Sequence, residues 1–374
     1  MTIGILCEPP DERRVSLLPD QAQSLIKQKI TVLVETNAGA LSFANDDFYT
    51  AKGVKATLRK DVLGVSDIIL SIHAPSEEDL ALLKTNAILM GVYQPLFNFM
   101  LMQQWASQNI TTFSLDMMPR TTRAQAMDVL SSQANIAGYK AVLLAASLYP
   151  KYFPMFMTAA GSVTPAKVLI LGAGVAGLQA IATARRLGAV VEVFDTRPAV
   201  KEEVMSLGAK FIEVEGAADA SKAGGYAVEQ TEEFKQKQDQ KIAESIIKAD
   251  VVITTAQIPG KPAPLLVSET MLQTMKPGSV IIDLAAATGG NTAKTQNDKT
   301  VQCNGVMIVG NSNLAAGMPT DASKLYGKNV LNFLQLIIAK DGQLNLNWDD
   351  DLVKGACITH GGEVVNERVK GLIG

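Results

Sequence analysis

Three glycines in the segment VLILGAGVAGLQ could bring the polypeptide backbone close to a phosphate group. Gly172 permits a tight turn, Gly174 removes the side chain where a pyrophosphate would approach, and Gly177 lets the following helix pack closely on the preceding strand. The amino end of that helix carries partial positive charge, which favours phosphate. Ala173 and Val175 complete the loop, so all five residues are predicted to contact a dinucleotide.

An acidic residue follows at the spacing typical of dinucleotide-binding domains. The strand-like run VVEVF ends at Asp195, close to the ~20 residues expected downstream of the glycines. Its carboxylate suits the two hydroxyls of a ribose and would repel a 2′-phosphate, so the pattern favours NAD over NADP. Thr196 and Arg197 are assigned to the same site. Arg197 could hold a 2′-phosphate, but we expect it to be solvated or to touch the adenine. The alternative is a domain of this shape without a ligand.

These residues require a strand, a helix and a second strand, and the surrounding chain supplies that pattern. Short β-branched runs alternate with helical patterns in both halves of the sequence, which predicts parallel sheets covered on both faces by helices. We therefore expect an α/β protein with two Rossmann-like parallel-sheet domains, joined by long helices, and a cofactor cleft between them. The expected N-terminal domain is discontinuous and comprises residues 1–133 and 335–374. The NAD-binding domain is expected to span residues 134–334.

Several segments have less regular patterns. Residues 120–149 predict one long helix or two, and residues 158–166 predict a loop of small residues. Residues 213–241 form an acidic, polar insert. The stretch FNFMLMQQW, residues 97–105, is rich in methionine and aromatic residues, and it could form core or a docking surface.

The composition disfavours several classes of function. The 374 residues carry a net charge of −3, so nothing favours a polyanionic partner such as nucleic acid. The three cysteines are scattered and the two histidines lie far apart, which predicts neither disulfides nor a metal site. The N-terminal segment lacks the pattern of a secretory signal, and no stretch approaches the roughly 20 apolar residues of a membrane span. We therefore expect a cytoplasmic protein with no direct membrane span.

Four longer segments resemble the NAD-binding (alpha) subunits of the proton-translocating NAD(P) transhydrogenase family. They are MPRTTRAQAMDVLSSQANIAGY, MTAAGSVTPAKVLILGAGVAGLQAIATARRLGA, AGGYAVEQTEEF and ITTAQIPGKPAPLLVSETMLQTMKPGSVIIDLA. The resemblance implies a component that binds NAD(H) and exchanges a hydride directly with NADP(H) held on a partner component. A membrane-spanning partner subunit would couple this transfer to proton translocation. The resemblance also implies a homodimer, held at the cytoplasmic face of the inner membrane through its partner subunits.

The same resemblance assigns four polar side chains in PRTTRAQAMDVLS to the nicotinamide. They are Arg120, Gln125, Asp128 and Ser131. The resemblance implies that these groups pin the dihydronicotinamide and its carboxamide. Positioning of this kind is enough, because hydride transfer between two cofactors needs no proton donor from the protein. Apart from the resemblance, the pattern fits an ordinary helix N-terminus, with TTRAQ supplying the cap.

Two further segments are assigned to the cofactor. The resemblance implies a mobile lid in SKAGGYAVEQ, with Gly224 and Gly225 as the hinge and Tyr226 covering a ring; a plain surface loop is the alternative. Gln257 follows the strand-like run VVITTA. Because ligands bind at the carboxyl ends of parallel strands, Gln257 should face the cofactor crevice, although the family usually has an apolar residue there.

Alanine dehydrogenase shares this fold and is the main rival. In its pattern an arginine and a lysine hold the substrate, a histidine acts as acid and base, and an aspartate follows the last sheet strand. The matching positions here hold Arg14, Ser71, Val92 and Ala287. Reduction of an imine needs a proton donor, so amino-acid chemistry by this chain alone is not expected. A functional role for His73, two residues from the lysine position, stays open. A non-catalytic NAD-binding regulator is a third possibility, which the polar loop residues disfavour.

Overall fold

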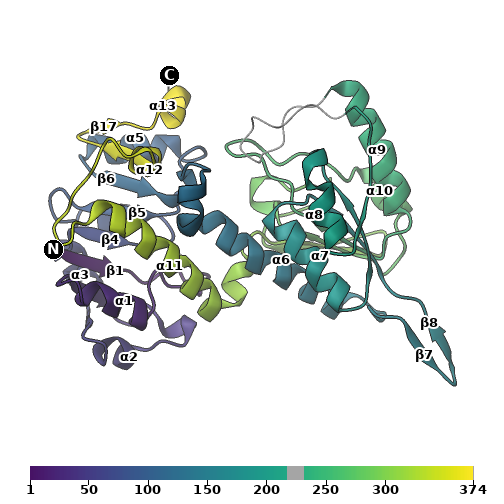
Figure 1. Ribbon diagram of the computed structural model, residues 1–374, viewed down its shortest axis with the longest axis horizontal. Helices are drawn as coiled ribbons and strands as arrows, with labels where there is room; N and C mark the ends of the chain where they lie inside the picture. Colours follow the sequence, from purple (N-terminus) through teal and green to yellow (C-terminus); the bar gives the residue numbers. More distant parts are fainter. Residues whose placement is uncertain (217–230, 374) are drawn as a thin grey trace. The chain divides into compact units, whose positions relative to one another are not determined.

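The computed structural model describes residues 1–216 and 231–373. The chain divides into two compact units, the first formed by Met1–Gln133 with Ala316–Gly374 and the second by Ala134–Ala315 (Figure 1). The first unit is therefore built from both ends of the chain. The chain passes between the units within helix α6 (Val129–Leu148) and within the short 3-10 helix η6 (Leu314–Gly317).

An eight-stranded sheet forms the centre of the first unit. Its strand order is β17-β16-β6-β5-β4-β1-β2-β3, with β16 and β17 antiparallel to their neighbours and the other strands parallel. The strands are β1 (Thr2–Ile5), β2 (Thr31–Glu35), β3 (Lys55–Thr57), β4 (Ile68–Leu70), β5 (Ile88–Gly91), β6 (Thr111–Ser114), β16 (Cys357–His360) and β17 (Glu363–Val364). Ile68 and Leu70 enter one hydrophobic cluster and Ile69 enters another. Alternate side chains thus reach separate cores on the two faces, as predicted.

Helix α11 joins this unit although it lies late in the sequence. The helices here are α1 (Pro19–Ile26), α2 (Asp46–Thr50), α3 (Arg59–Val65), α4 (Glu77–Leu80), α5 (Phe99–Ser107), α11 (Pro319–Ile337), α12 (Asp351–Ala356) and α13 (Glu367–Ile373), with 3-10 helices η1 (Ala40–Ser42), η2 (Leu115–Met117) and η3 (Thr122–Met127). α11 buries Tyr326, Val330 and Phe333 in the core of the first unit. The structure therefore places the boundary before α11 rather than at residue 334, because an apolar helix face does not specify which core it will join.

The methionine- and aromatic-rich stretch 97–105 supplies helix α5, which is largely core. Met102 and Trp105 are fully buried, and the Trp105 ring packs edge-on against Tyr93 with the ring centroids 5.2 Å apart. Phe97 and Met100 are exposed. Most of the apolar character of this stretch is therefore explained by packing within the first unit.

The second unit contains a seven-stranded sheet with the order β11-β10-β9-β12-β13-β15-β14. Its strands are β9 (Lys167–Leu171), β10 (Val190–Phe194), β11 (Lys210–Phe211), β12 (Val251–Thr254), β13 (Val280–Asp283), β14 (Lys299–Cys303) and β15 (Val306–Gly310), and only β14 is antiparallel among the described strands. The helices are most of α6, α7 (Val175–Arg186), α8 (Lys201–Ser206), α9 (Glu232–Ile246) and α10 (Glu269–Thr274). The order reverses between β9 and β12, and this switch point is where open α/β sheets bind ligands.

Several connecting segments take forms that the sequence left open or missed. Residues 158–166 were expected as a loop, but most of this stretch belongs to an antiparallel hairpin of β7 (Phe156–Thr158) and β8 (Gly161–Val163), which projects from the second unit (Figure 1). Residues 120–149 form η3 followed by α6, and the polar insert ends in α9. Among the described residues, no helix is both long and apolar enough to cross a membrane.

Candidate functional site

The glycine loop has the backbone geometry that a phosphate-binding turn needs. β9 ends at Leu171, and Gly172 adopts a φ of +107°, a left-handed conformation that favours glycine. A Cβ on Gly177 would lie 1.9 Å from the carbonyl oxygen of Gly172, so the close approach of α7 to the strand requires a glycine. A Cβ on Gly174 would meet nothing within 4 Å, so the loop is open at the amino end of α7, which begins at Val175. Gly172 and Gly177 thus have the turn and packing geometry predicted for them, and contact of Gly174 with a pyrophosphate stays a prediction.

Asp195 lies beside this loop, directly after β10. Its Oδ2 accepts a hydrogen bond of 2.7 Å from the backbone N–H of Ala173, so the carboxylate is fixed against the glycine turn. Thr196, the next residue, is half-buried. The carboxylate is therefore held where a ribose on the same turn could meet it.

Arg197 was expected to be solvated or to touch the adenine; the first alternative is wrong, and the second stays a prediction. Its backbone N–H and its Nε donate to Oδ1 of Asp195 at 2.8 and 2.9 Å, and Nη2 donates to Oδ2 at 2.7 Å. This hydrogen bonding to Asp195 raises the pKa of Arg197. Because the guanidinium is already matched by a carboxylate, the pair is a poor receptor for a 2′-phosphate, in keeping with the preference for NAD.

The loop after β12 borders the glycine turn. Thr255 Oγ1 donates to the carbonyl oxygen of Gly172 at 3.2 Å. Gln257 is exposed, and its Nε2 donates to the carbonyl oxygen of Leu284 at 3.1 Å. The Gln257 side chain thus bridges the loops that follow β12 and β13. Thr255 was not predicted from the sequence, although its place directly after a buried strand is the signal that could have identified it.

A buried polar network stabilises these same loops. Asn291 is fully buried; its Oδ1 accepts from the Ala256 N–H, and its Nδ2 donates to the carbonyl oxygens of Ala256 and Pro264. Asp283, at the end of β13, accepts from the Asn291 N–H at 2.6 Å and from the Thr295 hydroxyl at 2.6 Å. These groups fix the carboxyl edge of the sheet and were not identified from the sequence.

The four residues assigned to the nicotinamide lie in the first unit, around the break between η3 and α6. Asp128 caps α6: its Oδ1 accepts from the Ser131 N–H at 2.9 Å, and its Oδ2 accepts from the Ser131 hydroxyl at 2.6 Å. Arg120 and Gln125 are exposed on the preceding segment. The alternative of a cap supplied by TTRAQ is wrong in detail, because the N-cap of η3, Thr121, makes no side-chain cap bond.

A second polar cluster lies at the carboxyl ends of β1 and β4. Arg14 is buried, and its guanidinium pairs with both carboxylate oxygens of Glu12, at 2.8 Å through Nε and 2.6 Å through Nη2. Its Nη1 donates to Oε1 of Gln133 at 2.9 Å. The His73 ring, nearly half exposed, lies 2.9 Å from Glu12 through Nε2. The arginine matched to a substrate-binding position is thus held by residues of this chain.

The pKa values of two carboxyl groups in this region are shifted in opposite directions. Burial raises the pKa of Glu8 to about 7, although the Glu8 carboxylate accepts the N–H groups of Ile72 and His73. Burial also opposes ionisation of Glu12, but hydrogen bonds from Arg14 and His73 overcome it and hold the pKa of Glu12 well below its usual range. Glu12 is therefore a fixed negative charge, whereas Glu8 changes charge near neutral pH.

The other positions of the dehydrogenase pattern offer no acid or base. Ser71 is buried, with its hydroxyl 3.0 Å from that of Tyr93, and Val92 is half-buried. Ala287 is exposed, and its N–H donates to the Ser312 hydroxyl. Gly224, Gly225 and Tyr226 of the expected lid lie outside the described residues.

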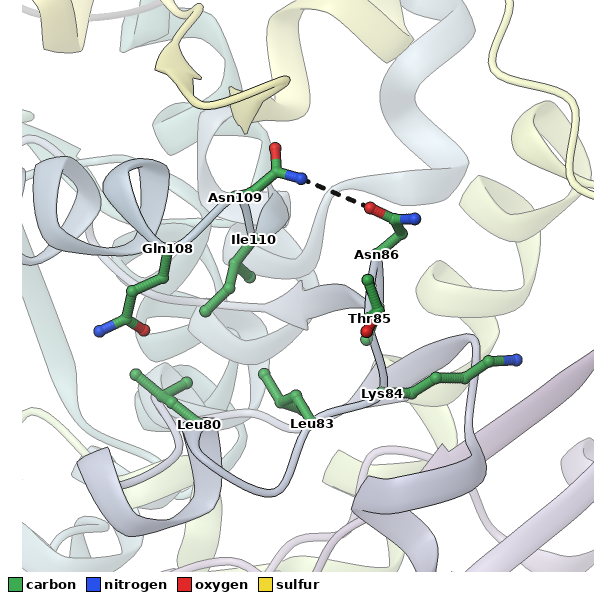
Figure 2. Close-up of a pocket in the computed structure, with 9 residues that line it drawn as sticks. Leu80, Leu83, Lys84, Thr85, Asn86, Gln108, Asn109 and Ile110 are labelled. Carbon is green, nitrogen blue, oxygen red and sulfur yellow. Dashed lines mark hydrogen bonds between the residues drawn. The ribbon is translucent and has the colours of Figure 1, made fainter.

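A pocket in the first unit lies away from all these residues, in the loops that lead into β5 and β6. Leu80, Leu83 and Ile110 line it, and Asn109 Nδ2 donates to Asn86 Oδ1 at 3.4 Å across it (Figure 2). It sits at the amino ends of these strands, opposite the edge at which such sheets bind ligands. No residue singled out from the sequence lines it.

Comparison with known proteins agrees with this arrangement. Residues 4–137 match the family model "Alanine dehydrogenase/PNT, N-terminal domain", and residues 141–367 match "Alanine dehydrogenase/PNT, C-terminal domain". The chain is 44% identical over 371 residues to an NAD(P) transhydrogenase subunit alpha chain of Rhodospirillum rubrum, covering 97% of each chain. It is 26% identical over 378 residues to the alanine dehydrogenase of Staphylococcus saprophyticus, covering 99% of this chain and 96% of that one.

Solved structures give the same result. A transhydrogenase from Sinorhizobium meliloti superposes with a TM-score of 0.89 at 45% identity, covering 98% of this chain and 100% of that chain. An L-alanine dehydrogenase superposes with a TM-score of 0.84 at 22% identity, covering 100% and 99%, which shows the shared fold alone. With both domain models matched and a transhydrogenase alpha chain similar over almost its full length, the chain belongs to the alanine dehydrogenase/pyridine nucleotide transhydrogenase family.

Proposed function

We propose that this chain is the NAD(H)-binding component of a proton-translocating, Re/Si-specific NAD(P) transhydrogenase. It exchanges a hydride directly between its own NAD(H) and NADP(H) bound on a partner component. One observation carries the proposal: a well-formed dinucleotide loop occurs in a chain whose substrate-site positions, Ser71 and Val92, offer no acid or base. The similarity to alpha chains of transhydrogenases supports it.

The residues of the second unit fit NAD(H). The open space at Gly174 and the amino end of α7 would receive the pyrophosphate, and Ala173 and Val175 line that turn. Asp195 would bind the hydroxyls of the adenosine ribose, with Thr196 and Arg197 beside it. Gln257 would contact the cofactor from the loop after β12.

Bound dihydronicotinamide supplies the hydride, and the protein has to orient its ring and exclude water. Arg120 and Gln125 offer hydrogen-bond donors to the cofactor, and the Asp128–Ser131 pair offers acceptors for a carboxamide N–H. The proposal requires that these side chains and the glycine loop contact the same bound cofactor.

Partner subunits complete the reaction. One holds NADP(H), and a membrane-spanning subunit couples hydride transfer to proton movement and places this chain at the cytoplasmic face of the inner membrane. The chain itself acts as a homodimer. Support for self-association comes from the β7–β8 hairpin, where Phe156 and Met157 are exposed, as is Met155 directly before it. A lone two-stranded hairpin is marginal in water, so a second copy packed on it would stabilise it.

The direct test follows NADH absorbance with the purified chain in two parallel reactions. One receives the NADP-loaded NADP-binding component of a transhydrogenase, and the other receives pyruvate and ammonium. NADH loss only with the component supports the proposal. Loss with pyruvate and ammonium would instead establish an NAD-dependent alanine dehydrogenase. Tight NADH binding without reaction in either, when the component is shown to dock, would leave a non-catalytic NAD-binding regulator.

A further inference from the structure

Two side chains of helix α11 donate hydrogen bonds to one backbone carbonyl group. That carbonyl group lies in the segment that carries the four residues assigned to the nicotinamide. The carbonyl oxygen of Ala126, between Gln125 and Asp128, accepts from Nδ2 of both Asn329 and Asn332, each at 2.8 Å. The two asparagines are three residues apart and so lie on one face of the helix. Two side-chain amides thus hold the end of η3, just before the chain turns into α6.

These asparagines are unexpected in their surroundings. Asn329 is only 8% exposed and lies next to Val330, on a helix that buries the apolar side chains of Val330 and Phe333. Asparagine is a poor helix former, and a buried amide without its full set of hydrogen bonds destabilises a protein. The Oδ1 of Asn329 is buried and finds no hydrogen-bond partner among the described residues. Stability of α11 alone therefore does not account for Asn329.

Helix α11 also binds the chain on the other side of the Asp128–Ser131 pair. Nε2 of Gln133 donates to the carbonyl oxygen of Ala322, in the first turn of α11, at 3.1 Å. Ala126 lies two residues before Asp128, and Gln133 lies two residues after Ser131. Hydrogen bonds to α11 therefore bracket the Asp128–Ser131 pair, which is itself closed by two hydrogen bonds.

We propose that Asn329 and Asn332 are positioning residues for hydride transfer. The inference rests on the proposed function: by fixing Ala126, they hold Gln125 and Asp128 at the place where the dihydronicotinamide must be pinned. They do not touch the cofactor. Loss of either amide leaves NADH bound by the second unit but relaxes the geometry of the reacting ring, and a misplacement of about 1 Å can slow a reaction about 100-fold.

The test compares Asn332→Asp with Gln335→Glu. Both changes convert an amide into an acid of the same size on α11, but Gln335 is exposed and Asn332 faces Ala126. Single-turnover hydride transfer from NADH to the NADP-loaded partner component is measured beside NADH affinity, the melting temperature and amide hydrogen exchange of residues 120–131. Asn329→Leu, which suits the apolar surroundings, is the second variant.

Asn332→Asp and Asn329→Leu should slow hydride transfer on the order of 10- to 100-fold, with NADH affinity within about 2-fold and faster exchange at residues 120–131. Gln335→Glu should match the unaltered chain in every measurement. Unchanged transfer rates in both asparagine variants would overturn the inference and leave the proposed function standing. Equal losses of rate and NADH affinity would also overturn it, because they indicate general damage. No transfer by the unaltered chain would overturn the proposed function, and the inference with it.

Discussion

Replacing Asp195 by asparagine should weaken NADH binding and narrow the discrimination against NADPH. In the structure this carboxylate accepts one hydrogen bond from Ala173 and three from Arg197. An asparagine of the same size keeps one acceptor oxygen, but its amide group turns a donor toward other donors. The substitution also removes the charge that neutralises the Arg197 guanidinium, so the attraction of this guanidinium for a 2′-phosphate increases.

The magnitude follows from the bonds involved. A hydrogen bond to a charged group contributes about 1.5–3 kcal/mol, so losing the carboxylate toward the ribose corresponds to a roughly 10- to 100-fold higher Kd for NADH. The Kd for NADPH should fall or stay constant, because repulsion of its phosphate is relieved. Fluorescence titration with each nucleotide measures both constants. Glu192→Gln, on the preceding strand and paired with Lys210 at 3.1 Å, is the control and should change neither. An NADH affinity within about 2-fold of the unaltered chain, or an unchanged preference, would refute the assignment of Asp195.

Three further outcomes are expected. Gly177→Ala places a methyl group 1.9 Å from the Gly172 carbonyl oxygen, so it should destabilise the second unit by about 1–3 kcal/mol and abolish NADH binding. Thermal unfolding and NADH affinity that both stay unchanged would contradict the tight packing of α7. Burial raises the pKa of Glu8 from its usual 4.5 to about 7, so the stability contributed by protonated Glu8 is complete below pH 4.5 and is lost as the pH rises through 7. Glu8→Gln should therefore reduce the change of melting temperature between pH 5 and 8. A variant whose melting temperature varies with pH as in the unaltered chain would refute this prediction. Met157→Asp with Phe156→Asp should shift a homodimer toward monomer in sedimentation without changing NADH affinity, and a dimer of unchanged stability would exclude the hairpin from the interface.

Local features of the dinucleotide loop could be predicted because they depend on neighbours in sequence. A buried strand, a turn with glycine at defined positions and a helix start are all set within about a dozen residues, and Gly172 and Gly177 have the geometry their types require. The alternation of strands and helices likewise predicted sheets covered on both faces. These features needed no knowledge of distant contacts.

Other features depend on contacts that sequence spacing does not encode. The amphipathic pattern of α11 predicted a buried face, but only the folded chain shows that Phe333 packs in the first unit. Arg197 could have faced solvent or a ligand, and its pairing with Asp195 comes from the local backbone after β10. The small residues around Gly161 suggested a loop, although backbone pairing with Thr158 makes a hairpin.

The segment that carries Asp128 and Ser131 shows the same limit. Asp128 and Ser131 are three residues apart, so their hydrogen bonds follow from a helix start. The bonds from Asn329 and Asn332 to Ala126 span about 200 residues of sequence. An asparagine in an amphipathic helix is ordinarily explained as part of a solvated face, so nothing in the sequence indicated its partner.

Direct transfer of label between the two nicotinamides is the most immediate test of the central claim. NADH carrying deuterium at both C4 positions is mixed with this chain and the NADP-loaded partner component, and the NADPH formed is examined by mass spectrometry. We predict that the deuterium is retained in NADPH, because the hydride passes from one ring to the other without meeting water. NADPH that carries hydrogen from the solvent, or no NADPH at all from a docked complex, would contradict the account.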